Sequence, residues 1–472
     1  MRGITSHCRT TPTPTRAPPT SPRMPLSARA RPLPALVCAI ASAAIFFPPS
    51  AAQVPWPATY VMNASTFVYT CNYTGLTDVS AGSIVSRFGL VAFDWSEAKA
   101  VWANEQPMAC EETLLQQAQA LKRTNPATRV MVYRNLVKAL PWMSTVRGAL
   151  EGADAASLFL SFATPTSPSH SPRCDATFDP PRCSQLFHDQ VQTPHYPNNS
   201  KYDGTCTRPC VCGGAALPCG EYLWDHRAPA VRDLIIKDYL LGATGMGSGA
   251  VDGFFFDDAW SSTQHVGSNA CDGSPIGGPS EVDSYCVQDM GLQASDTAAI
   301  TAAWAATTAA ATAAVNAAGG MVWAQFEQVN TPAANASDAC AAFFRGACGP
   351  SGAFQGVPLQ LLFSEAPGRV FNPLPHFAQD LATFLLVRGP HAWLGYTWNG
   401  CSFGSAPAGG RNNQSWTWPA ALDSDFGVPL DYCAETAAGS RVFERHWTRA
   451  NASFDCGAWE GRVTLTDGTR IA

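Results

Sequence analysis

The sequence predicts an α/β fold, a TIM-type (β/α)8 barrel with a Cys-rich loop insertion. Short apolar runs alternate with amphipathic helical segments along the chain, which is the pattern of parallel strands joined by crossover helices. Acidic and polar residues follow several of these runs directly, as they do at the C-terminal mouth of such a barrel. The length of 472 residues suits one barrel with insertions. A doubly wound open sheet is the alternative, although no G-x-G-x-x-G or Walker loop follows any predicted strand.

Residues 1–52 have the composition of a presequence. Residues 2–31 are rich in Pro, Thr, Ser and Arg and include no acidic residue. An apolar run follows at residues 35–47, and Ser50-Ala51-Ala52 supplies small residues for cleavage before Gln53. Because the run is short for a bilayer span, we expect a cleaved signal peptide and a secreted protein with no membrane contact in its mature form. A signal anchor is the alternative.

Residues 53–83 are expected to form an N-terminal extension and residues 84–400 the barrel. Runs rich in β-branched and aromatic residues predict seven strands, at residues 84–94, 129–135, 221–225, 251–257, 321–326, 359–364 and 392–398. The eighth strand has no clear signal. Apolar periodicity and terminal residues predict the intervening helices, at residues 111–124, 229–242, 295–319 and 377–387. Residues 401–472 are expected to pack on the barrel as a C-terminal segment.

Cysteine use agrees with export. Cys8 and Cys38 lie in the presequence, which leaves 15 of the 17 cysteines (17 − 2) in the mature chain. Six of them predict a disulfide-stapled insertion at residues 165–220, namely Cys174, Cys183, Cys206, Cys210, Cys212 and Cys219. A zinc knuckle is the alternative, but the spacing does not match a paired C-x2-C site. Elsewhere we expect Cys271 to pair with Cys286 and Cys340 with Cys348, and the odd total leaves a thiol free or intermolecular.

The segment Val251-Asp252-Gly253-Phe254-Phe255-Phe256-Asp257-Asp258-Ala259-Trp260 carries the strongest chemical signal. Its apolar run predicts a strand buried on both faces, and the strand ends in two adjacent carboxylates. Because side chains alternate along a strand, Asp257 points into the barrel mouth if Phe255 points into the barrel. Asp258 would then point sideways or lie just past the strand. A helix cap and a solvated strand end are the ordinary alternatives for these two residues.

Other chemically active residues stand at or beside predicted strand ends. Carboxylates with aromatic rings are typical of glycoside cleavage, in which one acid protonates the leaving oxygen and another serves as nucleophile or base. The catalytic candidates are Asp257, Glu365, Asp258 and Glu327. The candidates for substrate binding are Asp94, Trp95, Arg134, Asn135, Asp225, His226, Arg227, Trp260 and Trp398. Each has a local alternative, such as helix capping for Asp94 and Asp225, packing for His226, or simple ion pairing for Arg227.

Composition excludes several classes of partner. Charged residues make up 14% of the chain and the net charge is -6, with no basic stripe, so nucleic acid is not expected to bind. No cofactor and no metal are predicted, because a metal-dependent hydrolase would need a His/Asp cluster at one strand end and only Asp225-His226 approaches one. The oligomeric state is left open. Six N-x-[ST] sequons predict N-glycosylation, at Asn63, Asn72, Asn198, Asn335, Asn413 and Asn451.

The motif V-D-G-F-F-F-D-D-A resembles the fourth-strand V-D-G-F-R-x-D-A pattern of α-amylase-type (β/α)8 glycosidases. In that group the position of Asp257 holds the nucleophile, but Phe255 stands in place of the group's Arg, which argues against amylase activity itself. The chain resembles more closely the poorly characterised secreted glycoside-hydrolase-like barrel proteins of algae, oomycetes and other microbial eukaryotes. That resemblance rests on GLVAFDWSEAK (89–99), VMVYRNLVKALPW (130–142), CGEYLWDHR (219–227), VDGFFFDDAW (251–260) and FLLVRGPHAWLGYTWNGC (384–401). It implies a barrel and a sugar substrate.

These observations predict a secreted glycoside hydrolase that cleaves O-glycosidic bonds of a carbohydrate with a carboxylate pair. Asp257 is expected to be the nucleophile or the principal transition-state stabiliser. Glu365 is the first choice of general acid/base, followed by Glu327 and Asp258. The alternative is a non-catalytic carbohydrate-binding or cell-wall protein on a degenerate barrel, which would keep the Trp residues but lack a second carboxylate facing Asp257.

Overall fold

The structure of the chain is a computed structural model. It describes residues 56–103, 105, 107–161, 186, 188–189, 210–212, 215–217, 221–260, 292–324, 329–330, 336–355, 359–362, 376–399 and 418–471. The chain divides into two compact units, residues 1–49 and 50–472, and all described residues belong to the second. The expected presequence, most of the Cys-rich insertion and the expected Cys271–Cys286 pair therefore lie outside the described residues.

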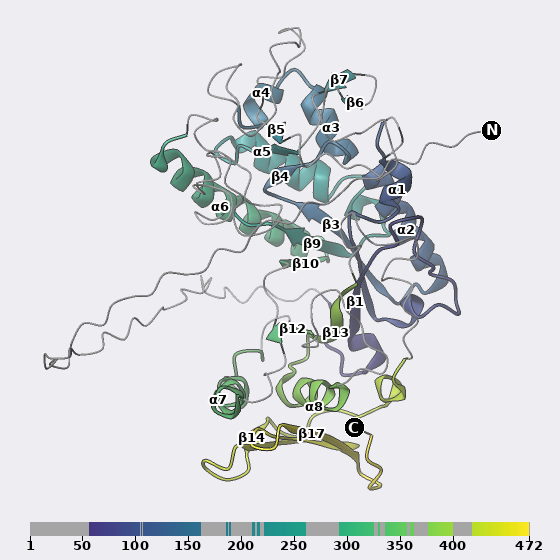
Figure 1. Cartoon of the computed structure of the whole chain (residues 1–472), viewed down its shortest axis with the longest axis vertical. Helices are drawn as coiled ribbons and strands as arrows, with labels where there is room; N and C mark the ends of the chain where they lie inside the picture. The colour runs from purple at the N-terminus through teal and green to yellow at the C-terminus, as the bar shows by residue number, and fades with distance from the viewer. Residues whose placement is uncertain are drawn as a thin grey trace, which may run out of the picture. The chain divides into compact units, whose positions relative to one another are not determined.

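The centre of the fold is a curled sheet of parallel strands (Figure 1). Within the described residues it has eight strands, in the order β10 (Met321–Ala324), β9 (Gly253–Asp257), β3 (Arg129–Asn135), β2 (Leu90–Phe93), β1 (Thr66–Thr70), β13 (Ala392–Asn399), β12 (Leu359–Leu362) and β11 (Val329–Asn330). All of their described pairings are parallel. The α/β class and the parallel sheet are thus confirmed.

The connection between the two edge strands shows how strongly this sheet curls. The chain passes from β10 at one edge to β11 at the other across residues 325–328 alone. Five Cα steps span at most about 19 Å, whereas eight flat strands would separate the edges by about 34 Å. The end of β10 and the start of β11 therefore lie closer together than a flat sheet allows, so the parallel sheet is curled.

Two strands differ from the prediction. β1 lies in the segment expected to precede the barrel, yet it pairs with both β2 and β13 and all five of its residues are buried. β1 is therefore a strand of the central sheet that the sequence did not predict. The prediction of a barrel strand at residues 221–225 is wrong. β8 (Glu221–Leu223) instead pairs antiparallel with β4 (Lys138–Ala139) and β5 (His188–Asp189), in a small sheet after β3.

The predicted helices are present, the one at residues 377–387 with the predicted bounds and the others with shifted ends. They are α2 (Cys110–Thr124), α5 (Pro229–Leu234) with its π-helical continuation η5 (Ile235–Leu240), α6 (Ala294–Ala317) and α8 (Phe377–Val387). Further helices are α1 (Lys99–Trp102), α3 (Ser144–Glu151), α4 (Ala155–Leu158) and α7 (Ser337–Ala347). Residues 295–317 of α6 are long and apolar enough to cross a membrane by composition. In this fold, however, α6 packs against β10 and η5.

The C-terminal residues form a separate antiparallel sheet that packs on α8, with β14 (Ala434–Glu435), β15 (Val442–His446), β16 (Ala450–Asp455) and β17 (Glu460–Leu465) (Figure 1). Phe443, Phe454 and Val463 are buried, whereas alternate residues face solvent. Arg445 lies on the same buried face as Phe443, and its guanidinium donates to the carbonyls of Leu385, Leu386 and Arg388. It thereby satisfies carbonyls that the end of α8 leaves without helical partners.

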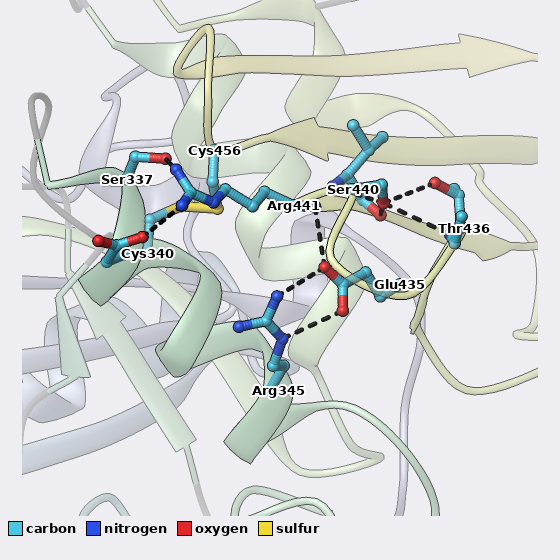
Figure 2. Close-up of polar contacts among 11 residues, drawn as sticks. Ser337, Cys340, Arg345, Glu435, Thr436, Ser440, Arg441 and Cys456 are labelled. Atoms are coloured by element: carbon cyan, nitrogen blue, oxygen red, sulfur yellow. Dashed lines mark hydrogen bonds and ion pairs between the residues drawn. A yellow bond between two sulfur atoms is a disulfide. The ribbon is translucent and has the colours of Figure 1, made fainter.

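Disulfides fasten α7 to this C-terminal sheet. Cys340 is bonded to Cys456 and Cys348 to Cys433, so the expected Cys340–Cys348 pair is wrong. The physical reason is that α7 is helical, and eight residues of helix span about 12 Å, too far for one disulfide. Figure 2 shows polar contacts beside the first bond, where Glu435 accepts hydrogen bonds from the Arg345 guanidinium and the Arg441 backbone.

Candidate active site

The C-terminal ends of β2, β3 and β9 bring polar side chains together at one mouth of the curled sheet. Asp257 ends β9 and lies in register with Asn135, which ends β3. The Phe255 ring packs on Tyr69 and Tyr133, at centroid distances of 4.8 and 5.8 Å, so Phe255 points into the barrel interior. Alternation then places Asp257 on the interior side at the mouth, as expected.

Asp257 is partly exposed at this mouth but densely surrounded by protein atoms. Its Oδ1 accepts the backbone N–H of Asp258 at 2.9 Å. Burial raises the pKa of Asp257 well above its usual range, the neighbouring Asp258 charge raises it further, and Lys138 opposes both effects. This carboxyl can therefore hold a proton at a pH where an exposed aspartate has lost it.

Asp258 does not point sideways as expected, because its backbone is left-handed, with φ 58°. This conformation breaks the alternation of the strand, and Asp258 Oδ2 turns back toward β3. There it accepts a hydrogen bond from Asn135 Nδ2 at 2.8 Å and lies 3.6 Å from Lys138 Nζ. A non-glycine residue in this region costs about 1 kcal/mol, and such strain concentrates at functional sites.

Asn135 is a hub of this mouth rather than a group free to bind substrate. Its Nδ2 donates to Asp258 and to the Tyr133 hydroxyl, at 2.8 and 3.0 Å. Its Oδ1 accepts the backbone N–H groups of Val137 and Lys138, at 2.8 and 2.7 Å. The carboxamide thus uses its four hydrogen-bonding positions within the protein.

Asp94 follows β2 and faces the same mouth from a more buried position. Its Oδ1 accepts the Ser96 N–H at 2.9 Å, and its Oδ2 has no hydrogen-bond partner among the described residues. Burial raises the pKa of Asp94, and the Asp94 charge in turn raises the pKa of Asp257. Tyr133 lies among Asp257, Asp258 and Asp94, and burial raises the pKa of its phenol with help from these charges.

Arg134 does not belong to this mouth. Because side chains alternate along β3, the Arg134 side chain points away from the barrel interior, opposite to Tyr133 and Asn135. On that side it is fully buried under the surrounding helices and forms an ion pair with Glu111 at 3.1 Å. It also donates to the carbonyls of Tyr239 and Thr244. Arg134 therefore joins β3 to α2 and to the segment after α5, and the structure places it away from the mouth.

The residues after β8 are also placed in structural roles. Asp225 forms a two-point ion pair with Arg227, which also contacts Asp296 at 3.1 Å on the surface. His226 is buried, with its Nε2 2.5 Å from the Leu136 carbonyl, and burial lowers its pKa to about 4. These contacts fix the polypeptide behind the mouth and leave none of the three residues directed into it.

The two tryptophans assigned to substrate binding whose side chains are described, Trp95 and Trp260, pack inside the protein. Trp95 is 8% exposed and stacks on Trp142 at 5.5 Å. Trp260 is 2% exposed and packs in an apolar cluster with Val137, Leu160, Leu223 and Ile300. Both rings are thus buried in packing contacts, and neither is placed with an open face at the mouth.

The remaining candidates lie outside what the structure describes. Glu327 and Glu365 are not among the described residues, and Trp398 is described only through its backbone in β13. The structure therefore neither places nor excludes these three side chains at the mouth. Within the described ranges, no group of three His, Cys, Asp or Glu side chains could hold a metal ion.

Sequence reasoning missed Tyr133, Lys138 and Glu97. Tyr133 and Lys138 both lie close to Asn135. The signal for Tyr133 was its position two residues before Asn135 on the same face of β3, whereas Lys138 lies past the end of that strand and had no such signal. Glu97 accepts hydrogen bonds from the Asn72 N–H and the Thr77 hydroxyl, at 2.8 and 2.9 Å, and from the Thr77 N–H. Burial raises its pKa to about 7, and its contacts give it a structural role in the loop after β1.

No family model and no curated protein matches the chain. Among solved structures, the chain is similar to sucrose 6F-phosphate phosphorylase from Thermoanaerobacter thermosaccharolyticum, with 8% identity over 87% of this chain and 97% of that one and a TM-score of 0.41. It is similar to the Nostoc punctiforme debranching enzyme, with 10% identity, 85% and 90% coverage and a TM-score of 0.36. It is also similar to the glycoside hydrolase domain of PelA from Pseudomonas aeruginosa, with 11% identity, 70% and 93% coverage and a TM-score of 0.28. Likenesses this distant carry no inference about the reaction.

Proposed function

We propose that the chain is a secreted glycoside hydrolase whose reaction takes place at the mouth formed by β2, β3 and β9. The observation that carries this proposal is the pair of aspartates at the end of β9. Asp257 is partly exposed and has a raised pKa, whereas Asp258 is held by an amide and an ammonium group. Two carboxyl groups in contrasting environments are what acid-assisted cleavage of a glycosidic bond requires.

The described tryptophans argue against the non-catalytic alternative. A carbohydrate-binding protein on this scaffold would depend on open aromatic faces at the mouth. Trp95, Trp224 and Trp260 are all buried in packing contacts. Carboxyl groups, rather than rings, therefore dominate the described part of the mouth, and catalysis is the better account. Glu365 and Glu327 remain proposed partners of Asp257 from later strands.

Asp257→Asn tests this proposal. Hydrolysis of a broad panel of glycosides by the purified protein should identify a substrate, and the substitution should lower kcat by at least about 10²–10³-fold. Asn keeps the shape of the side chain but can neither transfer the proton nor carry the negative charge. Asp225→Asn is the matched control, because Asp225 also follows a strand but pairs with Arg227 away from the mouth. Full activity of Asp257→Asn would end the catalytic assignment, and glycan binding without any hydrolysis would favour the binding protein.

A further inference from the structure

The two neighbouring aspartates at the end of β9 have different partners. Asp258 Oδ2 receives a hydrogen bond from Asn135 Nδ2 at 2.8 Å and lies 3.6 Å from the Lys138 ammonium group. The hydrogen bond that the structure shows for the Asp257 carboxyl comes from the Asp258 backbone, at 2.9 Å. These two partners of Asp258 are the last residue of β3 and a residue three positions after it. The polar contacts from β3 and the turn after it are therefore made to the Asp258 carboxyl group, not to that of Asp257.

We infer that Asn135 and Lys138 are positioning residues that keep Asp258 as the ionised carboxylate and leave Asp257 as the carboxyl that carries and transfers a proton. The chemical part of this inference rests on the proposed hydrolase function, and it gives Asp257 the proton-transfer role for which the sequence analysis chose Glu365 first. The electrostatic part concerns the free protein and can be measured without a substrate.

Charge balance at the mouth supports this division of roles. Two adjacent carboxyl groups in a poorly solvated site cannot both ionise cheaply, so their proton affinities separate. One buried cation, Lys138, lies against Asp258, and its side chain is 6% exposed. Ionised Asp258 lies against this cation, and Lys138 offsets only part of the burial and of the Asp258 charge that oppose a second negative charge on Asp257. The raised pKa of Asp257 agrees with this account.

Asn135 makes the arrangement rigid. All four of its hydrogen-bonding positions are used, and two of them bind backbone N–H groups of the turn that carries Lys138. The amide cannot rotate away from Asp258 without leaving these buried groups unpaired. The left-handed backbone of Asp258, with φ 58°, is held in place by the same contacts.

The roles give a balanced reaction. The glycosidic C–O bond breaks with its electron pair on the leaving oxygen, which takes the proton from Asp257. The positive charge that develops on the sugar is stabilised by the nearby Asp258 carboxylate. Water then adds to the anomeric carbon, and the proton that it releases restores Asp257. One glycosidic bond and one water give two hydroxyl groups, and no oxidant or other co-reactant is needed.

The full mature chain tests the inference through melting temperatures measured from pH 4 to 8. Asp257→Asn should raise the melting temperature at pH 7 by about 2–4 °C. An unfolded aspartate releases its proton near pH 4, whereas folded Asp257 retains it, so stability falls as the pH rises from about 4 toward the folded pKa. Asn removes this loss, and the gain should therefore vanish near pH 4. Asp258→Asn should instead lower the melting temperature at pH 7, because the Lys138 cation loses its carboxylate.

A double substitution separates positioning from general damage. Lys138→Met alone and Asp258→Asn alone should each lower the melting temperature, and together they should lower it by less than the sum, because neither charge is then left behind. Additive losses, or a decrease with Asp257→Asn equal to that with Asp258→Asn, would overturn the inference. Opposite shifts without cleavage of any glycoside would support the positioning pair and defeat the hydrolase proposal. Cleavage of a glycoside, together with melting-temperature shifts of the same sign for Asp257→Asn and Asp258→Asn, would support the hydrolase proposal and defeat the positioning pair.

Discussion

His226 shows how burial turns a titratable residue into a structural one. Its Nε2 donates to the Leu136 carbonyl, directly after the Asn135 hub, and burial lowers its pKa to about 4. In the unfolded chain a histidine takes up a proton near pH 6.5. The folded protein should therefore lose stability as the pH falls from about 6.5 toward 4, by up to about 3 kcal/mol from this residue.

His226→Gln should remove much of this acid sensitivity, because a Gln amide can donate to Leu136 but does not titrate. Chemical denaturation at a series of pH values checks it. The difference in unfolding free energy between the two proteins should change between pH 6.5 and 4 and stay constant from pH 7 to 8. A variant that loses stability in acid as steeply as the original protein would show that His226 titrates normally.

At the same scale, alternation along strands predicted some of the mouth and failed for the rest. The inward direction of Asp257 followed from the sequence, because Phe255 is two residues earlier on the same strand face. Asp258 could not be placed, because its left-handed φ depends on partners that come from β3. Arg134 and Asn135 were both assigned to substrate binding, but adjacent residues on a strand face opposite sides. That rule alone could have excluded one of the two.

Among the helices and strands, those with a strong apolar periodicity were predicted well from the sequence, whereas short apolar runs were predicted poorly. α2 has acidic residues in its first turn, basic residues in its last and a buried apolar stripe, and the sequence located it closely. β1 was missed although Thr66–Thr70 is rich in β-formers, because a five-residue run has no periodicity of its own. β8 was misplaced because propensity does not distinguish a barrel strand from a strand of a side sheet.

The attachment of α7 to the C-terminal sheet can be tested by removing one disulfide. Replacing both Cys340 and Cys456 by Ser should lower the free energy of unfolding by about 3–4 kcal/mol, because the bond closes a loop with a sequence separation of 116 residues. Denaturant unfolding measures this change, and peptide mapping without reduction should recover the Cys340–Cys456 and Cys348–Cys433 pairs. Arg345→Ala, which removes the exposed ion pair with Glu435, should have a far smaller effect. Recovery of a Cys340–Cys348 peptide would contradict the helical geometry of α7.

For the molecule as a whole, two arginines join the C-terminal sheet to the barrel. Arg445 binds the carbonyl end of α8, and Arg388, directly after α8, donates to the Thr59 carbonyl and the Ser65 hydroxyl near β1. The Arg388 guanidinium also lies 5.8 Å from the Trp447 ring of the C-terminal sheet. The first barrel strand, the last barrel helix and the terminal sheet thus share one buried contact, and sequence reasoning from single segments could not have located it.

Export remains a proposal, and the described surface makes it testable. Cleavage before Gln53 would retain Trp56, whose buried ring donates to the Gly319 carbonyl at 3.1 Å and packs on Trp393. Asn451 is exposed on β16, in register with His446 and Thr464 on the outer face of the terminal sheet. A glycan at this position would extend into solvent without disturbing the face that covers α8.

Secreted expression of the complete chain in a eukaryotic host should therefore yield a product that begins near Gln53 and carries an N-glycan at Asn451. N-terminal sequencing checks the first point, and the mass lost on treatment with an N-glycosidase checks the second. Ser453→Ala should abolish the glycan at Asn451, whereas Ser453→Thr should keep it, because only the second retains the acceptor sequence. Both substitutions fall on the same residue of β16, so a difference between them reports modification rather than folding. A membrane-bound product that retains residues 1–52, or an equal loss of mass from the two secreted variants on N-glycosidase treatment, would contradict the proposal.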